Sequence, residues 1–291
     1  MTELTALLAQ YQLYDKNYTG DKRYEEEKRL AAQQILDQIV KVGFMKKMDF
    51  GKYKVTFLPA GHIPGAMMLL IEFGKKKILY TGDYSLEETA LTSSCVIPED
   101  LKVDILIMCG LHAKHSDYVK RSNHLFKTVS FVMNTVTQKK KSILCQVNQL
   151  SKGIEFLKTL NEANKAQIPI YMDCGIMRVV EKMERAGVPI LTPYNKQITD
   201  KLPQEPHILI SSEKKNYGYY RYQVIKVDFS LHEDFEDMKR FIKKINPQKA
   251  VVVHCAKERD VFDTTIEQEL MYDGECKTQF IFAEDGESYI L

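Results

Sequence analysis

The sequence lacks a marked excess of charge of either sign. Its 41 lysine and arginine residues nearly balance 39 aspartate and glutamate residues, which leaves a formal net charge of +2 over 291 residues. No overall field therefore attracts a polyanionic partner, and any contact with nucleic acid depends on local clusters. Residues 75–77 and 139–141 are such clusters, all lysine, although short basic runs of this kind are typical of solvated turns.

The sequence also lacks a membrane segment and a disulfide framework. No apolar stretch approaches the roughly 18 residues of a transmembrane helix. Glu3 and Gln10 stand where a signal peptide would carry a basic and then an apolar region. The six cysteines show no Cys-x-x-Cys pairing, and several lie in apolar runs where a small buried side chain is expected. These features predict a cytoplasmic protein with reduced cysteines and no membrane partner.

The patterns that are present predict an α/β protein. With 44% hydrophobic and 27% charged residues, the chain is long enough for one large or two small domains, and no low-complexity linker divides it. From about Gly110, helical and strand patterns alternate, which is typical of a parallel sheet covered by helices. Before that point the periodicity predicts helices at 4–13 and 35–42, the second after the charged run 21–29, and strands at 53–58, 67–73, 77–81 and 104–108.

Two turn segments contain residues that could bind a metal ion. His62 lies in Ala-Gly-His-Ile-Pro-Gly-Ala, and Asp83 ends Tyr-Thr-Gly-Asp after an apolar run. Both residues are at the ends of predicted strands, where the glycines let the backbone turn sharply. Taken singly, each is more typical of a turn residue, because an aspartate after glycine often caps backbone N–H groups.

Together, these segments resemble the metallo-β-lactamase-fold ribonucleases with a β-CASP cassette, the family that includes the pre-mRNA 3′-end endonuclease. The resemblance continues in Phe-Ser-Leu-His ending at His232, similar to the family's Phe-Ser-x-His motif, and at His254, similar to its closing Val-His motif. It implies a partial αββα sandwich of the metallo-β-lactamase type with an inserted β-CASP-like parallel α/β cassette. The expected boundaries are 1–110 for the first lactamase-like segment, 111–222 for a shortened cassette and 223–291 for the closing segment.

The resemblance implies zinc-dependent hydrolysis of RNA at two zinc ions. His62, Asp83 and His254 are then the metal ligands, with the aspartate shared between the ions. Asp83 and His232 are the catalytic residues, His232 as a general acid for the leaving oxygen. Glu233 or the aspartate after it is expected to orient His232.

Several features of the family are absent from this sequence. The motif His-x-His-x-Asp-His, which contributes two ligands to each zinc, occurs nowhere among the seven histidines. Cys109 occupies the position of a cassette carboxylate, residues 151–155 replace a Gly-Arg helix start, and residues 211–227 are shorter than the family's equivalent. The sequence is therefore expected to begin after the first half of the lactamase domain. With two ligands per ion, it is expected to bind zinc weakly or not at all on its own.

Two function classes fit these observations. The first is a zinc-dependent ribonuclease, incomplete or split, whose missing motif comes from another polypeptide. The second is a non-catalytic pseudo-nuclease scaffold that pairs with an active relative; a gene fragment is a third possibility. Cys109 favours the scaffold, whereas retention of the four motif residues favours the enzyme. Both predict RNA and a protein partner, or self-association through a sheet face or edge left uncovered.

Another metal cluster is conceivable at His112 and His115. Residues three apart share one face of a helix, and an aspartate follows nearby. The segment follows Gly110 and precedes a helix that Ser116 or Asp117 would cap, so a loop explains it better.

Residues 214–222 mix cations with aromatic rings, a composition that grips phosphates and stacks bases. The candidate RNA contacts are Lys214, Lys215, Tyr217 and Arg221. A hairpin with residues 216–218 at its tip explains the same residues without RNA.

Overall fold

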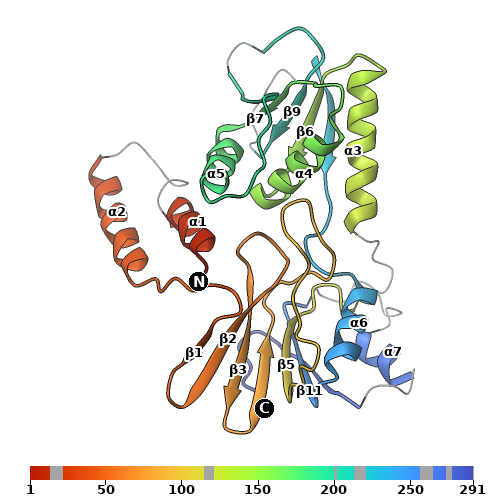
Figure 1. Cartoon of the computed structure of the whole chain (residues 1–291). Helices are drawn as coiled ribbons and strands as arrows, with labels where there is room; N and C mark the ends of the chain where they lie inside the picture. Colours follow the sequence, from red (N-terminus) through yellow and green to blue (C-terminus); the bar gives the residue numbers. More distant parts are fainter. Residues whose placement is uncertain are drawn as a thin grey trace. The chain divides into compact units, whose positions relative to one another are not determined.

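The protein is described by a computed structural model that covers residues 1–13, 22–114, 121–199, 202–212, 221–255, 265–272 and 277–290. It divides into two compact units, drawn in Figure 1. Unit 1 comprises Met1–Glu3, Lys41–Lys120 and Ser230–Leu291, and unit 2 comprises Leu4–Val40 and Arg121–Phe229.

Unit 1 is built on a seven-stranded mixed sheet in the order β1-β2-β3-β4-β5-β11-β12. The first four strands form an antiparallel meander, and β4, β5, β11 and β12 run parallel. The strands are β1 (Lys47–Asp49), β2 (Tyr53–Pro59), β3 (Met67–Phe73), β4 (Lys76–Tyr80), β5 (Ile105–Cys109), β11 (Lys249–Val253) and β12 (Gln279–Phe282). Because β4, β5 and β11 are parallel neighbours, their carboxyl ends meet at one edge of the sheet.

Helices α6 (Phe235–Ile245) and α7 (Ile266–Tyr272) pack on one face of this sheet. Apolar residues recur every three or four positions along α6, which places them on one side of the helix. The Asp234 carboxylate begins α6 by accepting a hydrogen bond from the Asp237 N–H. The resulting core includes Leu58, Met68, Leu79, Leu106, Met108, Phe235, Met238, Phe241 and Ile242. This packing fixes the segment just before α6, which contains His232, relative to the sheet.

The opposite face of the sheet is apolar and only partly covered by the described residues. Tyr53 and Phe73 lie opposite each other on β2 and β3 and are 42% and 57% exposed. Tyr80 on β4 is 41% exposed and, since side chains alternate along a strand, lies on the same face. We call the surface around these three residues the open face. The sequence predicts either an exposed apolar face or an unpaired sheet edge, and among the described residues these three exposed side chains agree with the first.

Unit 2 contains a five-stranded parallel sheet in the order β10-β6-β9-β7-β8. Its strands are β6 (Ile143–Val147), β7 (Ile170–Met172), β8 (Asn195–Gln197), β9 (Ile208–Ser211) and β10 (Gln223–Val227). Its helices are α1 (Glu3–Leu13), α2 (Lys22–Asp37), α3 (Arg121–Thr137), α4 (Leu150–Ala163) and α5 (Cys174–Arg185). The predicted parallel α/β cassette is thus present.

A buried carboxylate connects the sheet of unit 2 to its last helix. Asp173 is 2% exposed and caps α5 by accepting a hydrogen bond from the Ile176 N–H at 2.8 Å. The same side chain accepts hydrogen bonds from the hydroxyls of Ser211, the last residue of β9, and of Ser212. These contacts hold the start of α5 at the end of the neighbouring strand.

The structure differs from the sequence-based expectation in three places. The charged run 21–29 is expected to precede the second helix, but α2 already begins at Lys22. Glu, Lys and Arg are good helix formers, which explains the earlier start. Strand β10 pairs with β6 in the cassette sheet, so unit 2 extends to Phe229 instead of ending at residue 222. Residues 4–40 also group with unit 2, in contrast to the expected first segment of 1–110.

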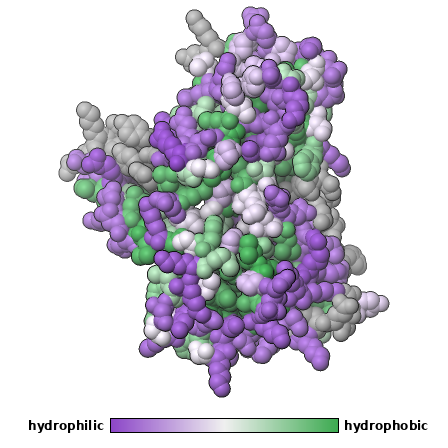
Figure 2. All heavy atoms as spheres, in the orientation of Figure 1, coloured by the Kyte–Doolittle hydropathy of each residue, from purple (hydrophilic) through white to green (hydrophobic). Residues whose placement is uncertain are grey.

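The face of the molecule drawn in Figure 2 is mostly hydrophilic, with hydrophobic residues in patches between the charged ones. Large apolar side chains such as Phe156 and Phe241 are fully buried within the units. None of the helices in the described part of the chain combines the length and hydropathy needed to cross a bilayer.

Candidate metal centre

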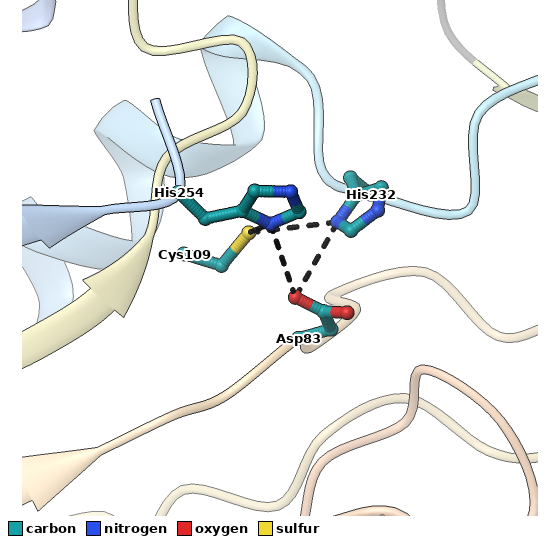
Figure 3. Close-up of side chains that lie close together, drawn as sticks. All are labelled: Asp83, Cys109, His232 and His254. Carbon is teal, nitrogen blue, oxygen red and sulfur yellow. Dashed lines mark hydrogen bonds and ion pairs between the residues drawn. The ribbon is translucent and has the colours of Figure 1, made fainter. Parts of the chain in front are cut away.

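Four side chains from distant parts of the sequence converge in unit 1. Asp83 follows β4, Cys109 ends β5, His232 precedes α6 and His254 directly follows β11. Figure 3 shows the four side chains pointing toward one another. Their potential ligand atoms all lie within 4.8 Å of one another.

The sheet topology explains this convergence. Strands β4, β5 and β11 are adjacent and parallel, so the residues at their carboxyl ends meet at one edge. Thr81 links two of these ends, since its backbone N–H donates to the Ile107 carbonyl and its hydroxyl oxygen accepts from the Cys109 N–H at 3.3 Å. The loop with Asp83 is thereby held beside Cys109.

The distances between the four groups fit one metal ion. Cys109 Sγ lies 3.5 Å from Nδ1 of His232 and 3.5 Å from Nδ1 of His254. Asp83 Oδ1 lies 3.6 Å from the first of these nitrogens and 3.8 Å from the second. In a tetrahedral zinc site with bonds of about 2.0–2.3 Å, neighbouring ligand atoms lie about 3.3–3.6 Å apart. A thiolate, two imidazoles and a carboxylate are also the groups that zinc prefers, so the residues present fit this metal.

His62 lies at the edge of the same group. Its Nε2 is 3.8 Å from Asp83 Oδ2, and its Nδ1 is 2.8 Å from the Leu231 carbonyl oxygen. Because a carbonyl can only accept, Nδ1 carries a proton, and Nε2 is the ring nitrogen that faces Asp83. His62 and His254 therefore each lie beside Asp83. Their ligation of metal stays a prediction.

Contacts on both sides of His232 fix its position. Its backbone N–H donates to the Ser230 hydroxyl, which lies 3.1 Å from Nε2 of buried His112. On the other side, Glu233 Oε1 accepts from the Leu86 N–H at 3.0 Å, and the next residue caps α6. Of the two histidines in the alternative cluster, His112 supports the segment that contains His232. His115 lies outside the described residues.

Cys109 is the residue whose role sequence reasoning missed. The sequence shows only that Cys109 stands where the family has a carboxylate. The structure places its sulfur beside two imidazoles. Burial raises the pKa of this thiol to about 12, with the Asp83 charge adding to the effect, so without a cation the group is a neutral thiol. The available signal was its position at the end of an apolar strand that neighbours the Asp83 strand.

The backbone at His254 is in the left-handed region, with φ of +57°. A non-glycine residue there costs about 1–2 kcal/mol, and such conformations cluster at functional sites. Here the left-handed turn directly after β11 directs the imidazole back toward Asp83.

One of the candidate RNA contacts lies in a basic pocket of unit 2. Arg221 is exposed and lines a cavity of about 520 Å³ together with Lys140, Lys141 and Tyr222. The remaining lining residues are polar: Ser142, Gln204 and Gln223. The pocket lies where β6 and β10 begin, so these side chains meet at one end of the sheet. Lys214, Lys215 and Tyr217 lie outside the described residues.

Comparison with known proteins gives one family match and several relatives. Residues 220–272 match the family described as Zn-dependent metallo-hydrolase RNA specificity domain. The chain is 30% identical over 162 residues to endoribonuclease ysh-1 of Neurospora crassa, covering 53% of this chain and 18% of that protein. It is 33% identical over 143 residues to cleavage and polyadenylation specificity factor subunit 3 of Dictyostelium discoideum, covering 47% and 18%. The chain spans less than a fifth of the length of these two relatives.

A solved structure has a similar fold. The crystal structure of a protein of unknown function from Enterococcus faecalis V583 superposes with a TM-score of 0.58 at 16% identity, covering 87% of this chain and 68% of that one. At this identity the similarity concerns the fold alone.

Proposed function

From its membership of the metallo-β-lactamase-fold ribonucleases with a β-CASP cassette, we propose that this chain takes part in zinc-dependent hydrolysis of phosphodiester bonds in RNA. The observation that carries the proposal is the convergence of Asp83, His232 and His254, three motif residues 171 positions apart at the extremes, within one metal ion's reach. If these motifs had lost their function, the fold would not require their three side chains to meet.

The chain's own residues have distinct parts in this proposal. Asp83 and His254 would hold zinc, and the Leu231 carbonyl fixes the tautomer of His62 that presents Nε2 to the same site. When bound, zinc supplies Lewis acidity and lowers the pKa of a bound water. His232 is held beside Asp83, where the sequence predicts a proton donor to the leaving oxygen.

The basic pocket of unit 2 is proposed to contact the RNA backbone. Lys140, Lys141 and Arg221 supply positive charge, and Tyr222 offers a ring beside them. Since such contacts release counterions, they contribute affinity that falls as salt is raised.

The double variant Lys141→Ala with Arg221→Ala is therefore expected to weaken binding to single-stranded RNA and to reduce the magnitude of the slope of log affinity against log salt by about 1.4, at about 0.7 per contact. Lys165→Ala is the control, since Lys165 is exposed in the same unit and does not line the pocket. Fluorescence anisotropy at several salt concentrations measures both. An unchanged slope in the double variant would remove the pocket from the RNA interface.

A second candidate is favoured by Cys109. Where the family pattern has a carboxylate, this chain has a buried thiol, which suits a non-catalytic subunit that binds RNA beside an active relative. The two candidates differ in one measurement. Chain reconstituted with zinc is incubated with a labelled single-stranded RNA and with DNA of the same sequence, with and without EDTA. Cleavage of RNA that EDTA abolishes supports the nuclease; RNA binding without cleavage at any zinc concentration supports the second candidate.

The open face is proposed to receive a further β-sheet from another polypeptide. Exposed aromatic side chains on one face of a sheet, here Tyr53, Phe73 and Tyr80, are typical of an interface. Phe73→Lys should then reduce association, whether with a partner or with a second copy. Size-exclusion chromatography with light scattering measures this, and a parent chain that stays a 33.7 kDa monomer alone and beside candidate partners would argue against the interface.

A further inference from the structure

We propose that one zinc ion is held in this chain by four protein side chains, Asp83, Cys109, His232 and His254, so that Cys109 is a metal ligand and His232 binds zinc instead of donating a proton. The choice of metal rests on the proposed function, but the ligand set does not depend on hydrolysis.

The first argument is geometric. Four separations between these atoms range from 3.5 to 3.8 Å, and each joins two of the four groups. The two distances to sulfur match the roughly 3.5 Å expected between a thiolate and an imidazole on one zinc. Side chains that only pack against one another have no reason to place sulfur, nitrogen and oxygen atoms at such similar separations.

The second argument concerns which atoms face the centre. Both His232 and His254 direct Nδ1 toward the sulfur and the carboxylate, although they come from a loop and a strand end. Cys109 is buried, whereas the side chains of Asp83 and His254 are 39% and 56% exposed. One divalent cation would accept a lone pair from each of the four groups at once.

The third argument is that the two oxygens of the Asp83 carboxylate face different groups. Its Oδ1 faces His232 and His254, and its Oδ2 faces His62. The first oxygen completes a set of four ligands. The second oxygen and His62 offer only two ligands to a further ion, which is too few for firm binding.

Two consequences follow for the centre. The sequence predicts weak zinc binding because it offers two ligands to each of two ions. Four ligands on a single ion instead predict that one zinc is retained per chain. Four protein ligands also leave no open position, unlike the three that catalytic sites usually have. A substrate oxygen then enters only by displacing a ligand or by adding a fifth. Binding deprotonates the Cys109 thiol and releases its proton to solvent.

Cobalt substitution tests the ligand set directly. Co²⁺ bound by a thiolate gives a charge-transfer band in the near ultraviolet, whereas binding by nitrogen and oxygen alone does not. We expect the full chain to bind one Co²⁺ with this band, Cys109→Ser to lose it, and Cys109→Asp to keep the visible cobalt bands without it. Cys174→Ser, a cysteine of unit 2 outside the cluster, should leave the spectrum unchanged.

A second variant separates this inference from the proposed function. His232→Ala should lower zinc affinity in a chelator competition by more than about 100-fold, beyond the loss typical of an outer partner. Unchanged zinc affinity in His232→Ala, or a charge-transfer band that persists in Cys109→Ser, would overturn the four-ligand set. Neither measurement reads RNA cleavage, so a chain that shows the band but never cleaves RNA upholds the ligand set while contradicting the nuclease.

Discussion

Replacing Gly61 by alanine is expected to lower the free energy of unfolding of unit 1 by more than about 3 kcal/mol, as left-handed strain and overpacking act together. Gly61 has φ of +72°, and a Cβ there would lie 2.4 Å from Cys95 N, 2.7 Å from Ser94 C and 2.8 Å from Ser85 O. All three are backbone atoms, which cannot rotate away as the end of a side chain can. Chemical denaturation followed by circular dichroism measures the loss.

Gly74→Ala is the matched control. Gly74 also has positive φ, +59°, in the same unit, but a Cβ there would meet nothing within 4 Å. This variant should lose only the strain of the left-handed region, about 1–2 kcal/mol. The difference between the two variants then isolates the crowding at Gly61. Equal losses would mean that the loop around Ser85 and Cys95 moves aside easily.

The crowding at Gly61 matters for the metal centre. The backbone of Ser85 donates to the Ala60 carbonyl and accepts from Cys95, so three segments pack tightly just before His62. A methyl group at Gly61 would push these segments apart and shift His62 away from Asp83. Zinc affinity measured on the folded fraction of Gly61→Ala should fall little if the four-ligand set holds, because His62 is outside that set.

Most of the fold could be predicted from periodicity. Residues 67–73 are apolar apart from Glu72, and the predicted strand coincides with β3. The three-residue strands β1 and β8 were missed, because three residues carry too little alternation to differ from a loop. The position of residues 4–40 in unit 2 could not be predicted either, since local pattern does not say which unit a helix packs on.

The candidate site was predicted less evenly. His62, Asp83, His232 and His254 stand in recognisable motifs, and the structure brings them together. Cys109 belongs to no motif, and its part depends on two facts that local sequence does not contain. The register of β5 against β11 places Cys109 opposite Val253, next to His254. The parallel pairing of β4 with β5 places the Asp83 loop at the same edge.

Replacing Asp83 by asparagine is expected to have the largest effect on function. The amide keeps the size of the side chain but removes its negative charge and one ligand oxygen. Both carboxylate oxygens face imidazoles, at 3.6 to 3.8 Å, so the change acts beside all three histidines of the site. We expect zinc retention to be lost and cleavage of RNA to fall by at least about 10³-fold, the upper end of the cost of losing one electrostatic group at an active site.

Asp100→Asn is the control for this change, since Asp100 is an exposed aspartate of the same unit outside the cluster. It should leave zinc content and cleavage unchanged. RNA affinity separates the causes further: the proposed RNA contacts are in unit 2, so Asp83→Asn should bind RNA as the parent does at equal salt. Loss of zinc, cleavage and RNA affinity together would indicate unfolding instead of a lost ligand. Cleavage that survives in a zinc-free Asp83→Asn chain would mean that the reaction does not use this centre, because no other group of described residues offers a comparable set of ligands.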